Sequence, residues 1–209
     1  MNRLPSLVRQ HIAALRMLLA FTVLCGIVYP VIMWGVAQAA FKGQADGSLV
    51  TFNGQVVGSS LLCQEFVNAK GDPLPQYFQP RPSAATSGAS NDYGCNPLFS
   101  AASNLGPTNP KLIAMIKARQ KQIAAFDHVP ISKIPPDAVT ASASGLDPDI
   151  SPAYAAIQVD RVAAARHISP AQVEALVSQN TTGRALGFLG EPVVNVLKLN
   201  IALDQKYPV

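Results

Sequence analysis

The 209-residue chain has few charged residues, and they are unevenly placed. Asp, Glu, Lys and Arg make up 13% of the sequence, against a usual quarter, while hydrophobic residues make up 49%. No acid accompanies Arg3, Arg9 and Arg16 near the N-terminus, and from Lys42 onward 13 basic residues face 12 acidic ones. The body therefore has a net charge of +1 and lacks the clustered basic face that nucleic-acid binding usually needs, so we expect no nucleic-acid partner.

Several chemical signatures are also missing. The sequence has no glycine-rich phosphate loop, no internal repeat and no Cys or His spacing typical of zinc sites. His128 and His167 are the histidines of the body, and neither has a Ser, Cys or carboxylate at a spacing diagnostic of catalysis. We therefore expect no catalytic residue, no metal site and no cofactor of the chain's own.

The stretch 17–41 contains no charged residue. About 20 helical residues cross a hydrocarbon core of about 30 Å. Because basic residues precede this stretch, the positive-inside rule places the N-terminus in the cytoplasm. We predict a basic cytoplasmic tail over residues 1–16, a single transmembrane helix over 17–38, and a periplasmic domain over 40–209. This arrangement corresponds to a bacterial inner-membrane protein.

A cleaved signal peptide is the alternative for this region. Ala37-Gln38-Ala39 matches the A-x-A pattern of a cleavage site, and it follows a basic tail and an apolar run. Either interpretation exports the body. A free periplasmic binding protein, or a periplasmic enzyme such as a hydrolase using Ser142 or Ser144, therefore remains an alternative.

The body contains Cys63 and Cys95, whereas Cys25 lies in the apolar stretch. In an oxidising compartment the first two can form a disulfide that closes a loop of about 30 residues, worth roughly 3 to 4 kcal/mol in the chain-entropy model. Two separate buried thiols are the alternative.

The body predicts an α+β fold, that is, a compact mixed α+β extracytoplasmic domain after the single N-terminal transmembrane helix. Asn53-Gly54 between β-forming residues indicates a hairpin, and a strand is expected to continue over 58–66. Further elements are expected as helices over 110–126, 152–167 and 170–179, strands over 139–142 and 193–197, and a terminal helix through Asp204.

Asp147 and Asp149 directly precede the helix expected at Pro152. A calcium-binding or general-acid pair is one interpretation. Acids at this position more often complement the positive N-terminal end of the helix, and we expect that structural role.

Residues 71–110 form a long connection rich in Pro, Ser, Asn and Gly. A loop of about 40 residues in a compact domain is usually functional or disordered. Tyr and Arg are favoured at protein interfaces, and this loop has both. We expect a partner interface formed by Tyr77, Phe78, Arg81, Pro82, Ser83, Ser103, Asn104 and Leu105. The alternative is that Arg81 and the aromatic residues pin the loop to its own domain.

Five ordered blocks carry a resemblance to one family. They are YFQPRPSA (77–84), ASNLGPTNP (102–110), VTASASGLDPDISP (139–152), Gln158 with RVAAAR (161–166), and LGEPVVNVLKLNIALD (189–204). Together they resemble the C subunit of the bacterial ATP-driven potassium-uptake (Kdp) complex. The similarity is collinear from the apolar stretch to the C-terminus.

The resemblance implies a retained membrane anchor and a non-catalytic accessory subunit of a potassium-importing P-type ATPase complex. The implied partners are a channel-like potassium-translocating subunit, a P-type ATPase subunit, a small single-span membrane peptide and membrane lipid. The implied roles are complex assembly and, as a catalytic chaperone, raising the affinity of the ATPase subunit for ATP, which that partner uses. Because ATP is cytoplasmic, we expect indirect coupling rather than ATP binding, with the interface docked on the outer face of the translocating subunit.

The chain departs from the family pattern in two places. Ala101 and Ala102 stand where the family usually has glycines, and because alanine resists positive φ, we expect a different loop shape there. Cys63 and Cys95 are not part of the family pattern.

Overall fold

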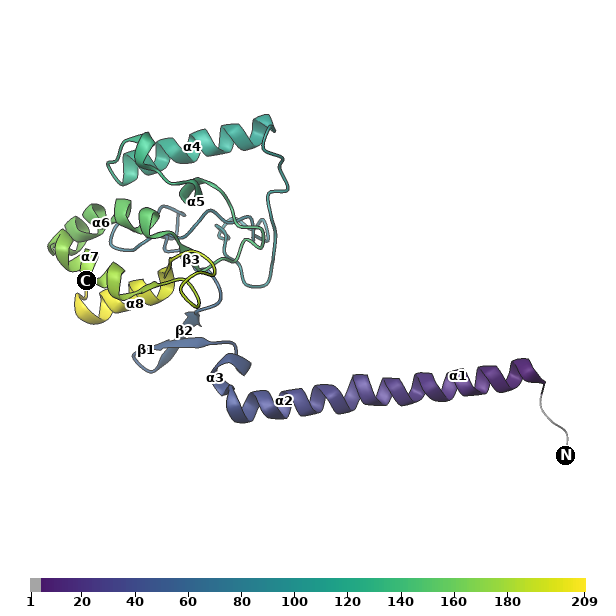
Figure 1. Cartoon of the computed structure of the whole chain (residues 1–209). Coiled ribbons are helices and arrows are strands. Elements are labelled where there is room, and N and C mark those ends of the chain that lie inside the picture. Colours follow the sequence, from purple (N-terminus) through teal and green to yellow (C-terminus); the bar gives the residue numbers. More distant parts are fainter. Residues whose placement is uncertain (1–4) are drawn as a thin grey trace. The chain divides into compact units, whose positions relative to one another are not determined.

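The computed structural model describes residues 5–209 and divides into two compact units. The first ends at Ser48 and is helical, and the second is Leu49–Val209 (Figure 1). The second unit combines helices and short strands, which confirms the predicted α+β fold behind a single long N-terminal helix.

The helical unit contains α1 (Ser6–Val23), a π-helical segment η1 (Leu24–Val28) and α2 (Tyr29–Ala40). They form one continuous helix of 35 residues whose most apolar part has a mean hydropathy of 2.2. At 1.5 Å per residue this helix is about 52 Å long, more than the roughly 30 Å of a hydrocarbon core. It is the candidate membrane span, and the predicted span 17–38 lies within it.

The π-helical segment ends at Val28, two residues before Pro30. A proline ring crowds the carbonyl four residues earlier and removes one backbone donor, and the wider turn of η1 is where the backbone adjusts to it. The helix ends at Ala40, and the short helix α3 (Lys42–Ala45) follows after Phe41. An ion pair between Lys42 and Asp46, at 3.2 Å, closes this turn.

The compact unit begins with an antiparallel hairpin of β1 (Leu49–Phe52) and β2 (Gln55–Ser59). Asn53 and Gly54 have φ values of 50° and 79°, so the predicted turn is confirmed. The predicted continuation of a strand over 58–66 is wrong beyond β2. Because the first residue of β1 already pairs with the last residue of β2, no partner remains for a longer ladder.

A second sheet has three short antiparallel strands in the order β3–β5–β4. The central strand β5 (Val193–Asn195) lies between β3 (Asp149–Ile150) and β4 (Thr181–Thr182). Ile150 and Val194 are fully buried, so this sheet forms one wall of the core.

The last helix, α8 (Val196–Lys206), begins inside the region 193–197 that was predicted as a strand. Asn195 explains the early start, because its side chain accepts a hydrogen bond from the amide of Lys198 at 3.2 Å and so caps the helix. The strand prediction is correct for three residues and wrong for the last two.

The other helices are α4 (Pro110–Phe126), the 3-10 helix η2 (Ile131–Lys133), α5 (Pro136–Val139), α6 (Pro152–Arg166) and α7 (Pro170–Gln179). The predictions of α4, α6 and α7 are confirmed. Each begins with proline behind a side-chain cap, which is Asn109, Ser151 or Ser169.

The strand predicted over 139–142 is wrong. Val139 ends α5, whose first residue is Pro136, and proline at that position favours a helix start. The hydroxyl of Thr140 then donates to the carbonyl of Pro136 at 2.7 Å. This local bond closes a helical turn, so the backbone there is not free to pair with a strand.

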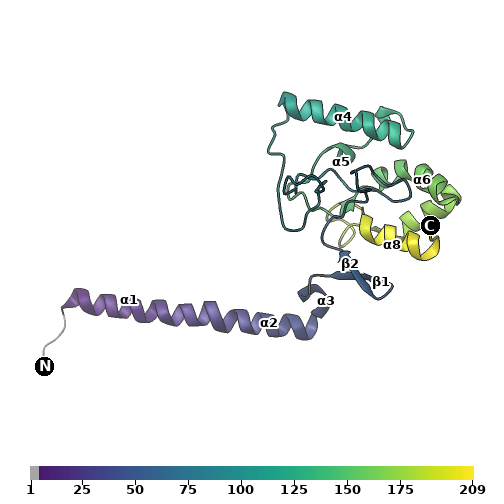
Figure 2. The same cartoon turned by 180° about the vertical axis from the view of Figure 1, so that it is seen from behind.

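The core lies between α6, α7, α8 and the three-stranded sheet. Figure 2 shows α4 on the outer side of α5, away from this layer. The largest fully buried side chains are Phe78, Ile150, Leu199, Leu203, Gln158, Val162, Val173, Val194, Val196 and Asn200. Phe78 is notable because it comes from the long connection and not from a helix or strand.

Candidate functional site

The long connection between β2 and α4 covers residues 60–109, and among these described residues only the isolated pairing of Val67 with Pro73 resembles a strand contact. The structure joins Cys63 and Cys95, the pair expected from the sequence, in a disulfide with a Cα–Cα distance of 5.4 Å. The amide of Cys63 also donates to the carbonyl of Leu146 at 3.0 Å. Covalent and hydrogen bonds therefore give this irregular segment a defined course.

Residues 75–83, which we call the clamped stretch, run along α6. Arg161 of α6 donates from Nη1 to the carbonyls of Pro75 and Tyr77, at 2.6 and 2.9 Å. Its Nε forms an ion pair with Asp127 at 2.7 Å, and both side chains are almost wholly buried. Burial raises the pKa of Asp127, while the charge of Arg161 opposes this shift. One buried guanidinium thus connects α6, the end of α4 and the clamped stretch.

Two buried amide side chains continue this clamp. Gln158 of α6 accepts the amide N–H of Gln79 at 2.7 Å and donates to the carbonyl of Gln79 at 3.2 Å. Asn200 of α8 does the same for Phe78, at 2.8 and 2.9 Å. Each side chain pairs with one residue's backbone as a neighbouring strand would. The clamped stretch is therefore fixed in the core although it belongs to no sheet.

Arg166, further along α6, ties the clamped stretch to the C-terminal helix. It donates to the carbonyls of Gln76 and Tyr207 and forms an ion pair with Asp204 of α8, each at 2.7 Å. The hydroxyl of Tyr77 donates to the same Asp204 carboxylate at 3.1 Å. Burial raises the pKa of Tyr77, and the neighbouring Asp204 adds to this shift.

The end of the clamped stretch is held by a different part of the chain. Arg81 forms an ion pair with Asp147 at 2.7 Å and donates to the carbonyl of Thr140 at 3.4 Å. Its Nε is buried and has no hydrogen-bond partner among the described residues. Ser83 donates its hydroxyl to the carbonyl of Gly145 at 2.6 Å. These bonds join two sequence blocks that carry the family resemblance.

Asp147 and Asp149 do not complement the start of α6 as predicted. Asp147 binds Arg81, and Asp149 accepts a hydrogen bond from Asn195 at 3.0 Å. The acid at that helix start is Asp137 of α5, which accepts from both the amide and the hydroxyl of the capping Ser151, at 2.8 and 2.9 Å. Asp137, from another helix, therefore supplies the negative charge at the start of α6 that we had predicted for Asp147 and Asp149.

The sequence-predicted interface residues fall into two groups. Five of them lie in the clamped stretch, along their own domain. Phe78 among them is 0% exposed, so its ring belongs to the core and cannot reach a partner while the domain is folded. The other three lie at the surface of a separate segment. The first group is Tyr77, Phe78, Arg81, Pro82 and Ser83, and the second is Ser103, Asn104 and Leu105.

The second group belongs to residues 98–107, which we call the open stretch. Leu98 is 86% exposed and Phe99 is 43% exposed. Asn104 is also exposed and has a φ of 51°, a left-handed conformation that asparagine tolerates. Sequence reasoning missed Leu98 and Phe99, although two consecutive apolar residues in a polar loop were a usable signal. The open stretch presents apolar side chains outward.

Gly145 is essential to the way in which the open stretch is attached. It has a φ of 71°, and a Cβ there would lie 2.5 Å from the carbonyl oxygen of Ala101 and 2.9 Å from Ala85. The neighbouring carbonyl of Ser144 accepts the amide N–H of Ala101 at 2.9 Å. Ala101 and Ala102 both keep negative φ, so the loop does not need glycine at either position.

A cleft of about 260 Å³ lies beside the clamped stretch. Glu65, Arg81, Arg119 and Tyr154 contribute polar groups to its lining. Burial raises the pKa of Glu65 to about 7 and also raises the pKa of Tyr154. Glu65 forms no ion pair among the described residues, so no bonded cation opposes this rise of its pKa.

The two serines considered for a hydrolase are turn residues. The hydroxyl oxygens of Ser142 and Ser144 each accept a nearby backbone N–H, at 2.9 and 3.1 Å. His128 and His167 adopt left-handed φ values of 55° after α4 and α6, and no hydrogen bond joins them to these serines in the part of the chain that the structure describes. Within residues 5–209 no group of three or more His, Cys, Asp or Glu is placed to hold a metal ion.

Comparisons with known proteins agree on one family. Residues 11–205 match the family model for KdpC, described as K+-transporting ATPase, c chain. The chain is 48% identical to the potassium-transporting ATPase KdpC subunit of Mycobacterium tuberculosis over 198 residues, which cover 94% of this chain and 98% of the relative. The same-named subunit of Kineococcus radiotolerans is 47% identical over 205 residues, 98% of each chain, and that of Citrifermentans bemidjiense is 48% identical over 195 residues, 93% and 96%.

Proposed function

This chain belongs to the KdpC family of K+-transporting ATPase c chains, and we propose that its compact unit caps the potassium-translocating subunit on the outer face of the membrane. The chain is a non-catalytic accessory subunit of a potassium-transporting ATPase complex, and the other Kdp subunits are its partners. It is membrane-associated through one candidate transmembrane helix. The proposal adds the side of the membrane, the docking surface and the route by which the chain affects ATP use.

Charge at the two ends of the helix supports the outer placement. Arg9 and Arg16 lie in its N-terminal part, and Arg3 of the same basic group lies outside the described residues. At the other end of the uncharged stretch 17–41, the positive charge of Lys42 is neutralised by an ion pair with Asp46. The positive-inside rule therefore favours a cytoplasmic N-terminus. Between the two ends, the outward apolar side chains suit lipid, the translocating subunit and the small single-span peptide.

Cysteine labelling tests this orientation. A single cysteine added after Val209, in a Cys25→Ser background, should react with a membrane-impermeant maleimide on intact cells, because Cys63 and Cys95 are already bonded to each other. Labelling only after the cells are opened contradicts the outer placement. The N-terminus of the mature chain distinguishes an anchor that retains Met1 from a signal peptide cut after Ala39.

The docking surface is the open stretch, and the single observation that carries it is the exposure of Leu98 on an anchored loop. The clamped stretch has used its polar groups within its own domain, so it offers little to a partner. In the open stretch the backbone amides of Leu98 and Phe99 donate to Asn96, both at 3.0 Å, while their apolar side chains stay exposed, as does Asn104. Apolar side chains on a fixed backbone are favourable anchors, because little conformational freedom is lost on docking.

A double variant, Leu98→Asn with Phe99→Ser, tests this docking surface. We expect its recovery with the tagged translocating subunit, and potassium uptake at limiting potassium, to fall about tenfold. Ile113→Gln on α4 is the matched control, because Ile113 is 42% exposed, like Phe99, and lies on another element. Normal recovery of the double variant contradicts docking through the open stretch.

We assign the effect on ATP affinity to coupling through the partner subunits. With the compact unit outside and ATP inside, contact between them is excluded, and a docked cap acts by favouring one state of the ATPase subunit. The Leu98–Phe99 double variant should therefore raise the KM for ATP of the remaining assembled complex. A photoreactive ATP analogue should label the ATPase subunit and leave this chain unlabelled, and labelling of the compact unit contradicts indirect coupling.

A further inference from the structure

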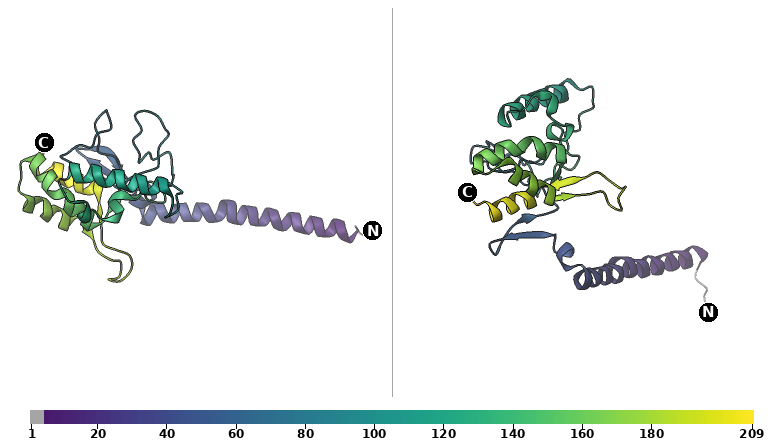
Figure 3. Two further views of the ribbon diagram at one scale, coloured as in Figure 1. Left: turned by 90° about the horizontal axis from the view of Figure 1, so that it is seen from above. Right: turned by 60° about the vertical axis from the view of Figure 1, so that its left-hand side comes forward.

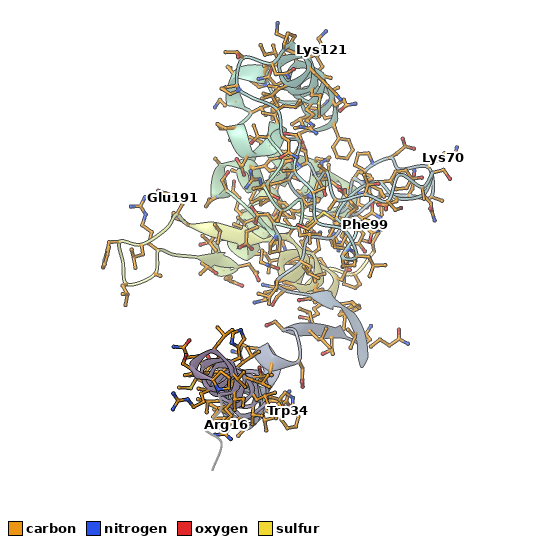
Figure 4. The ribbon with its side chains drawn as sticks, turned by 90° about the vertical axis from the view of Figure 1, so that its right-hand side faces the viewer. Arg16, Trp34, Lys70, Phe99, Lys121 and Glu191 are labelled. Atoms are coloured by element: carbon orange, nitrogen blue, oxygen red, sulfur yellow. A yellow bond between two sulfur atoms is a disulfide. The ribbon has the colours of Figure 1, made fainter. Side chains whose placement is uncertain are left out.

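A second exposed feature of the compact unit is the loop that connects β4 to β5. We call residues 183–192 the apolar finger. Every residue from Thr182 through Glu191 is exposed, and the two strands at its base pair antiparallel, with Thr182 opposite Val193. Figure 3 shows this loop leaving the compact unit and returning to it, and Figure 4 shows Glu191 on a segment that stands away from the body.

The tip of the finger has a defined backbone. Ala185 and Leu189 exchange two backbone hydrogen bonds, both at 2.9 Å, and the amide of Gly187 donates to the carbonyl of Arg184 at 3.1 Å. Leu186 has a φ of 54°, which a leucine adopts only at an energetic cost. The loop therefore holds its apolar residues in one arrangement and does not trail as a random coil.

The tip exposes three large apolar side chains within four residues. Leu186 is 83% exposed, Phe188 is 69% exposed and Leu189 is 50% exposed. Single exposed apolar residues are ordinary, but a group on one projecting tip marks a surface that becomes buried in an assembly. Nothing within the described compact unit covers these side chains.

Charge identifies the kind of surface that the tip fits. Arg184 and Glu191 form an ion pair of 2.7 Å at the neck, and no charged residue lies between them. Loops that bind bilayers usually add Trp, Tyr or unpaired Lys and Arg at the headgroup level. The finger has none of these, so an uncharged protein pocket suits it better than a lipid surface.

We propose that the apolar finger inserts into an uncharged, apolar pocket on another subunit of the potassium-transporting ATPase complex. The finger is a contact separate from the open stretch. The proposal rests on membership in that complex, and it requires neither the docking of Leu98 nor a particular membrane orientation. Phe188 and Leu186 are the anchors, and the Arg184–Glu191 pair rests on the rim of the pocket.

Crosslinking in the assembled complex tests the proposal directly. A photoreactive phenylalanine analogue replaces Phe188 in the full chain, and the same analogue replaces Ile131, which is 47% exposed on η2, as the matched control. The Phe188 probe should crosslink to another ATPase subunit more strongly than the control. Crosslinks only to lipid, crosslinks only to a second copy of this chain, or yields no higher than the control each overturn the proposal.

A double variant, Leu186→Asn with Phe188→Ser, measures the energetic contribution. Asparagine tolerates the left-handed φ, so the melting temperature of the full chain in detergent should stay unchanged. Recovery of this variant with a tagged ATPase subunit should fall about tenfold. Unchanged recovery overturns the proposal. The Leu98–Phe99 variant is measured in parallel. If recovery falls with only one of the two variants, the contact exists at that site, the finger or the open stretch, and not at the other.

Discussion

The clamped stretch and the open stretch belong to the same irregular connection, yet their side chains are used in opposite ways. In residues 75–83 the backbone is bonded by Arg161, Gln158, Asn200 and Arg166 from two helices, and the ring of Phe78 enters the core. In residues 98–107 the backbone is attached, but Leu98 and Phe99 face outward. Tyr and Arg in a long loop therefore indicate that the loop makes contacts. They do not indicate whether these contacts are with a partner or with the loop's own domain.

Removing Arg161 is the strongest way to break the clamped stretch. Arg161→Ala leaves Asp127 buried without its ion-pair partner and frees two carbonyls. We expect the free energy of unfolding to fall by about 3 to 5 kcal/mol, measured by urea denaturation of the full chain in detergent. Arg161→Lys keeps the positive charge but loses the forked guanidinium, so its free energy of unfolding should lie between those of the wild type and the alanine variant. A loss below about 1 kcal/mol for the alanine variant would show that the clamp does not hold the fold.

The disulfide is the second largest contribution, and it closes the loop that contains the clamped stretch. Cys63→Ser opens the bond that closes the connection, with a sequence separation of 32. The chain-entropy model predicts a loss of about 3 to 4 kcal/mol in unfolding free energy. Cys25→Ser is the control, because Cys25 is free and exposed on the long helix and should cost little. Equal stability of the two variants would contradict a bonded pair.

Some of this architecture could be predicted from sequence because its signals are local. The Asn53-Gly54 turn and the Ser-Pro starts of α6 and α7 depend on neighbouring residues, and all are confirmed. The clamp could not be predicted, because Arg161 meets Pro75 and Asp127 only after α4 and α6 have packed. For the same reason Phe78 was expected at an interface and lies in the core. Local pattern gives elements, while the partner of a polar side chain depends on the fold.

Glu65 lies between the clamped stretch and residues 91–97, and its titration tests how well this part of the connection is buried. It lines the cleft beside the clamped stretch and also the groove beside residues 91–97. Burial raises the pKa of Glu65 from 4.5 to about 7 in the folded state. Between these pH values the folded chain binds more protons than the unfolded chain, so its contribution is fully present below about pH 4.5 and is lost as pH rises through 7.

The whole change in the pKa of Glu65, from 4.5 to about 7, corresponds to about 3.5 kcal/mol at about 1.4 kcal/mol per pKa unit. Part of it is already lost below pH 5, so the expected loss between pH 5 and pH 8 is on the order of 2 to 3 kcal/mol. Glu65→Gln should remove this part of the pH dependence and stabilise the chain at pH 8. Urea denaturation at pH 5 and pH 8 gives the comparison, with Glu174→Gln on the exposed face of α7 as the control. A wild-type and variant pair with parallel pH profiles would show that the Glu65 carboxyl is not buried.

Substitution of Arg81 should have the smallest effect on the free energy of unfolding. It also tests most directly whether the clamped and open stretches have different roles. Its ion pair with Asp147 is partly exposed, and its second bond, to Thr140, is long at 3.4 Å. Arg81→Ala should therefore lower the unfolding free energy by only about 1 to 2 kcal/mol, while the folded chain still assembles with its partner subunits. Arg81→Lys should recover part of the loss, because it keeps the charge near Asp147. The Leu98–Phe99 double variant should behave in the opposite way, with normal stability and weak assembly. If Arg81→Ala instead leaves stability unchanged and weakens assembly, Arg81 belongs to the interface, and the clamped stretch ends before it. Loss of an ion pair within the domain would lower stability and leave assembly intact, so it cannot explain that result.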